Sequence, residues 1–189
     1  MREWADIQGE IACENLDMHS LLPVANRPRL FLGRARPRWS LARNFVQQFY
    51  AWYVPEALKE HKGPAWDPAL QYRRADFDDR LARLLMNDSE AQARCEELVG
   101  IDFDPLLNTQ DPAERYEVGR ITQAGSRYRA GIYAVDSGKP SKRADVRTEV
   151  VNTNSHWKFV NFLYPDGTNL VDILKKPQPK CTQPRPAGK

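Results

Sequence analysis

Apolar side chains recur every four residues in the stretch NFVQQFYAWYV, which runs from Asn44 to Val54. This spacing is the apolar stripe of a helix. Ser40 can accept hydrogen bonds from the free amides of a first turn, and Pro55 cannot continue a helix, so the sequence predicts a helix between these two residues. The stripe and the aromatic residues that widen it are Leu41, Phe45, Val46, Phe49, Tyr50, Trp52 and Tyr53. A stripe this broad predicts a concave partner that wraps around the helix.

Two further helices are predicted after a proline-rich connection. Residues 77–86 carry an apolar stripe, and Asp76, Asp78 and Asp79 stand at its start, where acidic residues favour the amino terminus of a helix. Ser89 opens the next helix, with Gln92 at the spacing of a capping box and Gly100 at its end. The segment from Gly100 to Tyr116 then mixes acids, amides and two Asp-Pro steps with apolar side chains, which predicts an ordered loop packed on the core.

From Tyr116 onward the apolar period becomes two, which is the period of a strand. Four strands in two hairpins are predicted, at residues 116–123, 127–135, 146–153 and 156–164. Gly119 and Gly131 lie inside these strands and predict bulges or a sharp bend, as a strongly curved sheet requires. The last strand is apolar on both faces, which predicts a central position in the sheet.

These elements predict an α+β fold in which amino-terminal helices pack on a curved antiparallel sheet of about four strands, in the shape of a cone. A length of 189 residues suits one domain. Three regions are expected. Residues 1–39 form a disordered or loosely attached basic arm, residues 40–174 form the α+β domain, and residues 175–189 form a disordered, proline-rich basic tail.

The net charge of +3 comes from the ends of the chain, because residues 44–174 hold 16 Lys or Arg and 20 Asp or Glu. Surfaces that bind nucleic acid need clustered basic side chains. The composition therefore argues against nucleic acid as a partner. No apolar run approaches the ~20 residues of a transmembrane helix. The chain also shows no apolar export segment, which predicts a cytoplasmic protein.

Cys13, Cys95 and Cys181 are widely spaced and form no CxxC pair. This spacing argues against a disulfide framework and against a zinc site, so Cys95 is interpreted as a small, partly buried residue. No metal and no cofactor is expected, since the sequence contains no HExxH, phosphate-loop or dinucleotide motif.

Several stretches of the chain resemble one family. They are FVQQFYAWYV, RLARLL, IDFDPLLNTQDP and HWKFVNFLYPDG, and they are similar to the uncharacterised bacterial family called domain of unknown function 3828. That family looks like a member of the cystatin-like or nuclear-transport-factor-like cone superfamily. The resemblance covers about residues 43–174 and implies a pocket between helix and sheet. It also implies a location in the periplasm or envelope, although this chain lacks both an export segment and a lipobox cysteine.

Relatives with the cone fold include isomerases and dehydratases that hold a carboxylate or a His-Asp pair in an apolar cavity, where burial raises the pKa of the base. The resemblance makes Asp102, Asp104 and His156 candidate bases. Candidate hydrogen-bond donors are Tyr50, Tyr53 and Tyr133. Each of these residues also has a structural interpretation, because aspartates cap turns in proline-rich loops and buried tyrosines pack in cores.

The sequence contains no catalytic motif, so we predict a non-catalytic binding or accessory domain rather than an enzyme. Its helix-sheet cone would hold a small apolar ligand or a protein partner. The candidate ligand-binding residues are Tyr50, Tyr53, Asp102, Asp104 and Tyr133. Two alternatives stay open: a cofactor-free isomerase, dehydratase or hydrolase with an Asp base in the cavity, and an immunity or inhibitor protein that acts through the acidic surface of the domain.

Overall fold

The computed structural model describes residues 37–97, 99–177 and 181–182, so most of the predicted basic arm and of the predicted tail lies outside the described residues. The helical elements are α1 (Arg38–Ala57), α2 (Asp67–Tyr72), the 3-10 turn η1 (Arg74–Asp76), α3 (Asp79–Arg94) and α4 (Leu170–Leu174). The strands are β1 (Tyr116–Ala124), β2 (Arg127–Asp136), β3 (Lys139–Pro140), β4 (Val146–Thr153) and β5 (His156–Leu163). The predicted α+β class is confirmed.

The long amino-terminal helix α1 exceeds its predicted bounds at both ends. It begins at Arg38, and the Ser40 hydroxyl donates to the carbonyl of Pro37 instead of accepting from the first turn. It also continues through Pro55 to Ala57, so the predicted stop is wrong. The helix tolerates this proline because its missing amide falls in the last turn, where little helix remains to be broken.

The two helices predicted between residues 77 and 100 are one helix up to Arg94, which is α3. Its amino terminus is capped by Asp78, whose carboxylate accepts from the amide of Leu81 at 2.8 Å. Ser89 opens no new helix. Its hydroxyl accepts from the Trp66 indole at 3.0 Å and donates to Asp67 at 2.6 Å, which fastens the unpredicted helix α2 to α3.

The predicted hairpins form an antiparallel sheet in the order β1-β2-β4-β5, with the two-residue strand β3 added beside β2. A register shift between Val118 and Ile121 confirms the bulge predicted at Gly119. Gly131 pairs regularly with Arg147, so no bulge forms there. A second register shift lies between Glu149 and Val150.

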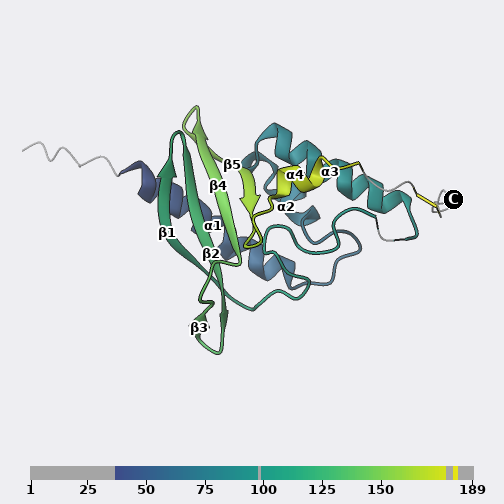
Figure 1. Ribbon diagram of the computed structural model, residues 1–189, viewed down its shortest axis with the longest axis horizontal. Helices are drawn as coiled ribbons and strands as arrows, with labels where there is room; N and C mark the ends of the chain where they lie inside the picture. The colour runs from purple at the N-terminus through teal and green to yellow at the C-terminus, as the bar shows by residue number, and fades with distance from the viewer. Residues whose placement is uncertain (1–36, 98, 178–180, 183–189) are drawn as a thin grey trace, which may run out of the picture. The chain divides into compact units, whose positions relative to one another are not determined.

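The last strand, β5, lies at an edge of the sheet, which corrects the predicted central position. Its apolar faces are covered because α3, α4 and η1 pack against it. Its free edge is covered too: Phe77 bridges to Phe159, and Asn169 bridges to Leu163. In Figure 1, α2, α3 and α4 accordingly gather beyond the β5 end of the sheet, while α1 runs behind β1 and β2.

Aromatic rings fill the space between α1 and the sheet. Phe49 is fully buried, and its ring centroid lies 4.6 Å from that of Phe159 and 5.7 Å from that of Phe77. The concave partner predicted for α1 is therefore the sheet itself, closed by these rings. No helix among the described residues is long and apolar enough to cross a membrane.

Candidate functional site

Asp104 lies at the centre of a buried polar network and is only 3% exposed. One carboxylate oxygen accepts the Tyr53 hydroxyl at 2.9 Å. The other accepts the backbone amides of Leu106 and Leu107 at 2.8 and 3.2 Å. One oxygen therefore holds the turn that follows Asp104, and the other binds the Tyr53 side chain of α1.

Two more tyrosines hold the same turn. Tyr50 donates to the carbonyl of Leu106 at 2.7 Å, and Tyr164 donates to that of Pro105 at 3.0 Å. Burial, followed by the nearby Asp104 charge, raises the pKa of Tyr50 and that of Tyr53. Three predicted site residues, Tyr50, Tyr53 and Asp104, are thus brought together, but each points into a satisfied hydrogen-bond network.

Burial raises the pKa of Asp104 from 3.8 to about 6, although the hydrogen bonds from Tyr53, Leu106 and Leu107 oppose this shift. A carboxyl group with this pKa could serve as a base near neutral pH. Such a role needs an oxygen that can reach a substrate. The three hydrogen bonds occupy the oxygens that would have to do so.

Asp102 is exposed and lines a cavity of about 290 Å³ together with Phe103, Asp104 and Gln110. The Gln110 side chain donates to the backbone carbonyl of Asp102 and so stabilises the loop. The Asp102 carboxylate takes no part in this hydrogen bond. His156 is exposed at the first position of β5. His156 therefore lies outside the buried network around Asp104, whereas the charge of His61 does act on Asp104 and lowers its pKa.

Tyr133 lies on the other face of the sheet from this network. A Cβ atom built on Gly119 would come within 2.6 Å of the Tyr133 ring, and one on Gly131 within 2.9 Å. The ring therefore packs against the two glycines. The neighbouring β2 residue Ile132 points to the opposite face, where it is fully buried in the core.

A groove that the sequence did not predict follows α1 and the edge strand β1. One cavity of about 520 Å³ is lined by Arg43, Gln47, Tyr50, Ala51, Val54 and Pro55 of α1 and by residues 114–118. A second, of about 750 Å³, is lined by Trp39, Arg43 and residues 117–121. The two share Arg43, Glu117 and Val118, so they form one surface, which we call the α1–β1 groove.

The floor of the α1–β1 groove is an exposed stripe of α1. Arg43, Gln47 and Ala51 stand four residues apart and are all exposed. Trp39, one turn earlier, is 54% exposed. The signal in the sequence that could have indicated this stripe is the four-residue spacing of the polar residues Arg43 and Gln47. The position of this stripe beside the edge strand β1 follows from the packing of α1 on the sheet, which the sequence of the helix does not reveal.

The edge strand turns part of its backbone toward this groove. The Arg43 guanidinium donates to the carbonyl of Val118 at 3.1 Å. In β2, Ile132 lies opposite Val118, and Ala134 lies opposite Tyr116. The carbonyls of Ile132 and Ala134 accept the amides of Asp145 and Ser141, which lie on the side of β2 away from β1. In an antiparallel ladder, their partners Val118 and Tyr116 then direct their own polar groups outward, away from β2.

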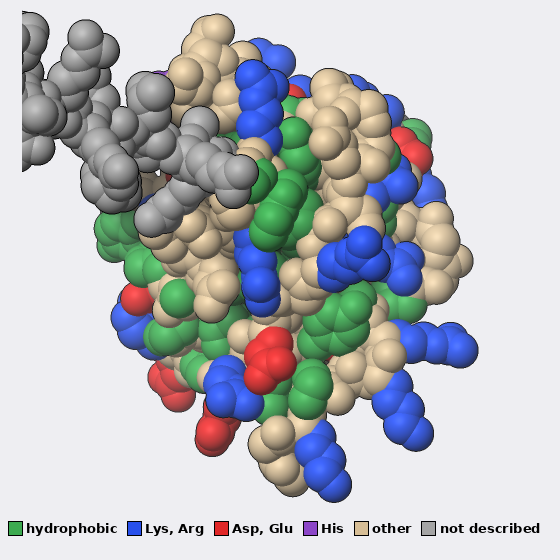
Figure 2. Space-filling view, turned by 90° about the vertical axis from the view of Figure 1, so that its left-hand side faces the viewer, with side chains coloured by type: hydrophobic (Ala, Val, Ile, Leu, Met, Phe, Trp, Pro, Cys, Tyr) green, Lys and Arg blue, Asp and Glu red, His purple; other side chains and the backbone are tan. Residues whose placement is uncertain are grey.

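Basic side chains are concentrated in the sheet half of the molecule. Residues 116–163 hold eight Lys or Arg and four Asp or Glu, whereas residues 37–115 hold ten and fourteen. Glu149 is 2% exposed and is clamped by Arg127 and Arg129 at 2.6 Å each. Figure 2 looks at the side on which β1 lies in Figure 1, and basic side chains are spread over it with fewer acidic ones among them.

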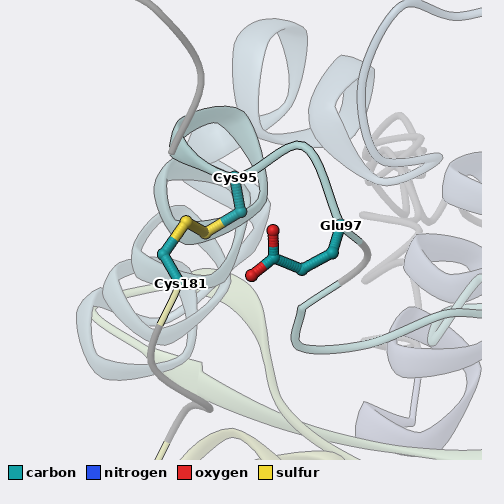
Figure 3. Close-up of side chains that lie close together, drawn as sticks. All are labelled: Cys95, Glu97 and Cys181. Carbon is teal, nitrogen blue, oxygen red and sulfur yellow. A yellow bond between two sulfur atoms is a disulfide. The ribbon is translucent and has the colours of Figure 1, made fainter. Parts of the chain in front are cut away.

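Cys95 and Cys181 form a disulfide, so the prediction of no disulfide is wrong. Cys95 directly follows α3, and its partner is 86 residues further along the chain (Figure 3). Glu97 fastens the same segment, because its carboxylate accepts the amide and the hydroxyl of Thr182. Spacing along the chain cannot reveal such a pair, since only the fold returns residue 181 to the end of α3.

The ligand atoms of Cys95, Glu97 and Cys181 lie within 4.8 Å of one another. Figure 3 shows the three side chains grouped at the end of α3. Metal binding by cysteine requires thiolates. The two sulfurs are bonded to each other, so in the disulfide form these three residues are not a set of metal ligands.

No family model matches the chain, and no curated protein or solved structure was found to be similar to it.

Proposed function

We propose that this chain is a non-catalytic binding domain whose partner is a protein that docks in the α1–β1 groove. The observation that carries the proposal is the groove itself, which runs continuously from Trp39 to Pro55 beside an edge strand. Binding grooves combine a concave surface, exposed aromatic anchors and a few polar groups. Trp39, Arg43 and Gln47 supply an anchor, a cation and an amide.

The filled interior favours a protein partner over a small apolar ligand. The ligand site expected from the sequence lies between α1 and the sheet. There Phe49, Phe77 and Phe159 are fully buried, and their rings contact one another. A ligand there would have to displace core side chains, at a cost of several kcal/mol. The α1–β1 groove is already open.

The contacts of Asp104 favour a binding function over catalysis. A general base must reach a substrate proton, whereas both Asp104 oxygens hold the turn at Leu106 and Leu107 or accept from Tyr53. The enzyme alternative would have to depend on the exposed Asp102 alone.

Photo-crosslinking in cells of the source organism tests the proposal. A photoreactive phenylalanine at Gln47 should give one discrete adduct, whose protein component is identified by mass spectrometry and purified. The same label at Arg83, an exposed residue of α3, is the matched control, because α3 packs on α2, α4 and β5 and not in the groove.

The purified partner is then titrated against the wild type and Ala51→Glu, which places a charged side chain on the exposed floor of the groove. We expect Ala51→Glu to weaken binding at least tenfold, about 1.4 kcal/mol, with an unchanged melting temperature. Equal affinity for the two proteins, or the same adduct from Arg83, would contradict the proposal.

A further inference from the structure

We infer that the segment received by the α1–β1 groove is an acidic, extended stretch of the partner protein, which pairs with β1 as an additional strand. This inference rests on the proposed function and specifies what the groove binds. It depends on the difference between the two sheet edges, on the backbone groups of β1 and on the charge of the sheet.

The two edges of the sheet are treated differently by the fold. Along β5, Phe77 and Asn169 bridge to the strand, and the amide of Asp78 donates to the carbonyl of Phe159 at 2.9 Å. Along β1, the described residues supply one comparable bond, from the side chain of Arg43 to Val118. An edge strand with free backbone groups is a template for another strand.

The pairing region is short and can be located. The bulge between Val118 and Ile121 interrupts β1, so an added strand would pair along Tyr116 to Val118. The Arg43 guanidinium donates to the Val118 carbonyl, as the amide of a neighbouring strand would. An incoming strand amide can replace it as the donor to this carbonyl. Alternate side chains of the added strand would then enter the groove toward Gln47 and Ala51.

Charge complementarity selects an acidic segment. The sheet carries twice as many basic as acidic residues between Tyr116 and Leu163. The groove is lined by Arg43, Arg115 and Arg120 and by Glu114 and Glu117, a net charge of +1. An incoming carboxylate could pair with the Arg43 side chain released from Val118. A second copy of this chain is disfavoured as the occupant, since pairing β1 with β1 would bring two basic sheets together.

The experiment selects from a displayed library of ten-residue peptides that carry Glu at every second position and random residues between them. A matched library with Lys in place of Glu is the control. Enriched peptides are labelled with fluorescein and titrated by fluorescence anisotropy against the full chain, Arg120→Glu, and Lys139→Glu, a charge reversal on the exposed strand β3.

We expect enrichment only from the Glu library, at least fivefold weaker binding to Arg120→Glu, and less than twofold change with Lys139→Glu. N-methylation of one alternating set of peptide amides should weaken binding at least tenfold, while N-methylation of the other set should change it less than twofold. This asymmetry is specific to strand pairing, in which only every second amide faces the neighbour.

Enrichment from the Lys library, equal effects of the two N-methylated sets, or dimerisation of the chain through β1 would overturn the inference. The proposed function would survive these results if the crosslinked partner still depends on Ala51. If instead the enriched peptides bind Ala51→Glu as tightly as the wild type, the groove is not the binding surface and the proposed function fails.

Discussion

Asp104 is a buried carboxyl group whose environment acts on its pKa in two directions. Burial raises the pKa, and the bonds from Tyr53 and two amides lower it, leaving it at about 6. In the unfolded chain the Asp104 carboxyl has its ordinary pKa of 3.8, so it loses its proton at a lower pH than in the folded protein. The group therefore favours the folded state most at low pH, and this contribution is lost as the pH rises from about 4 to about 6.

Asp104→Asn should remove this pH dependence. A shift of about two pKa units corresponds to roughly 3 kcal/mol over the whole titration. Part of it is already lost at pH 4, so the free energy of unfolding of the variant, relative to that of the wild type, should rise by about 2–2.5 kcal/mol between pH 4 and pH 7. Urea denaturation at both pH values measures it. Asp102→Asn, at an exposed neighbour, is the control and should follow the wild type. A constant difference between Asp104→Asn and the wild type would show that the pKa of Asp104 is not raised.

The hairpin of β1 and β2 shows how small residues position a large one. Gly119 and Gly131 lack the Cβ atoms that would come within 3 Å of the Tyr133 ring, so the ring lies against the strands. This packing gives Tyr133 a structural role on the face opposite Tyr50 and Tyr53. Its position explains why these three tyrosines, which the sequence suggested as one group, do not form one site.

A double-mutant cycle tests this packing. Gly119→Ala should destabilise the protein by about 1–2 kcal/mol, because the new methyl group displaces the Tyr133 ring. In a Tyr133→Ala background the same substitution should cost less than about 0.5 kcal/mol. Thermal or urea unfolding of the four proteins gives the coupling energy. Additive effects would mean that the ring does not rest on Gly119.

The disulfide is the long-range covalent constraint of the described fold, since it joins the end of α3 to residue 181. Cross-links that close long loops stabilise proteins chiefly by restricting the unfolded chain, typically by 2–4 kcal/mol. Disulfides also persist in oxidising compartments. From the disulfide we therefore expect the protein to reside in an oxidising compartment.

Thiol titration checks the disulfide. The chain has three cysteines, so the unfolded, unreduced protein should show one free thiol, from Cys13, and the reduced protein three. Cys95→Ser should lower the free energy of unfolding by about 2–4 kcal/mol, and Cys13→Ser should leave it unchanged. Three free thiols without reductant would rule the disulfide out.

Acid trapping of thiols in growing cells checks the compartment. If the protein resides in an oxidising compartment, Cys95 and Cys181 should be protected from alkylation until a reductant is added. Their immediate alkylation in intact cells would place the protein in a reducing compartment. Wild-type protein that is reduced before alkylation shows the position of the unprotected species on the gel.

Local periodicity accounts for what the sequence determined by itself. Four-residue spacing predicted α1, and two-residue spacing predicted four strands within a residue or two of their observed bounds. These patterns depend on which side chains must be buried in a single element, and neighbouring residues carry that information. The glycine at position 119 likewise predicted its bulge.

Only the tertiary structure decided how these elements meet. β5 is apolar on both faces because α3, α4 and η1 cover it, a packing that its own sequence cannot distinguish from a central position in the sheet. Ser89 looks like a helix cap locally, but its bonds to Trp66 and Asp67 make it part of a helix interface. The disulfide and the α1–β1 groove have the same origin: each joins residues far apart in the chain, and their proximity is a property of the packed fold.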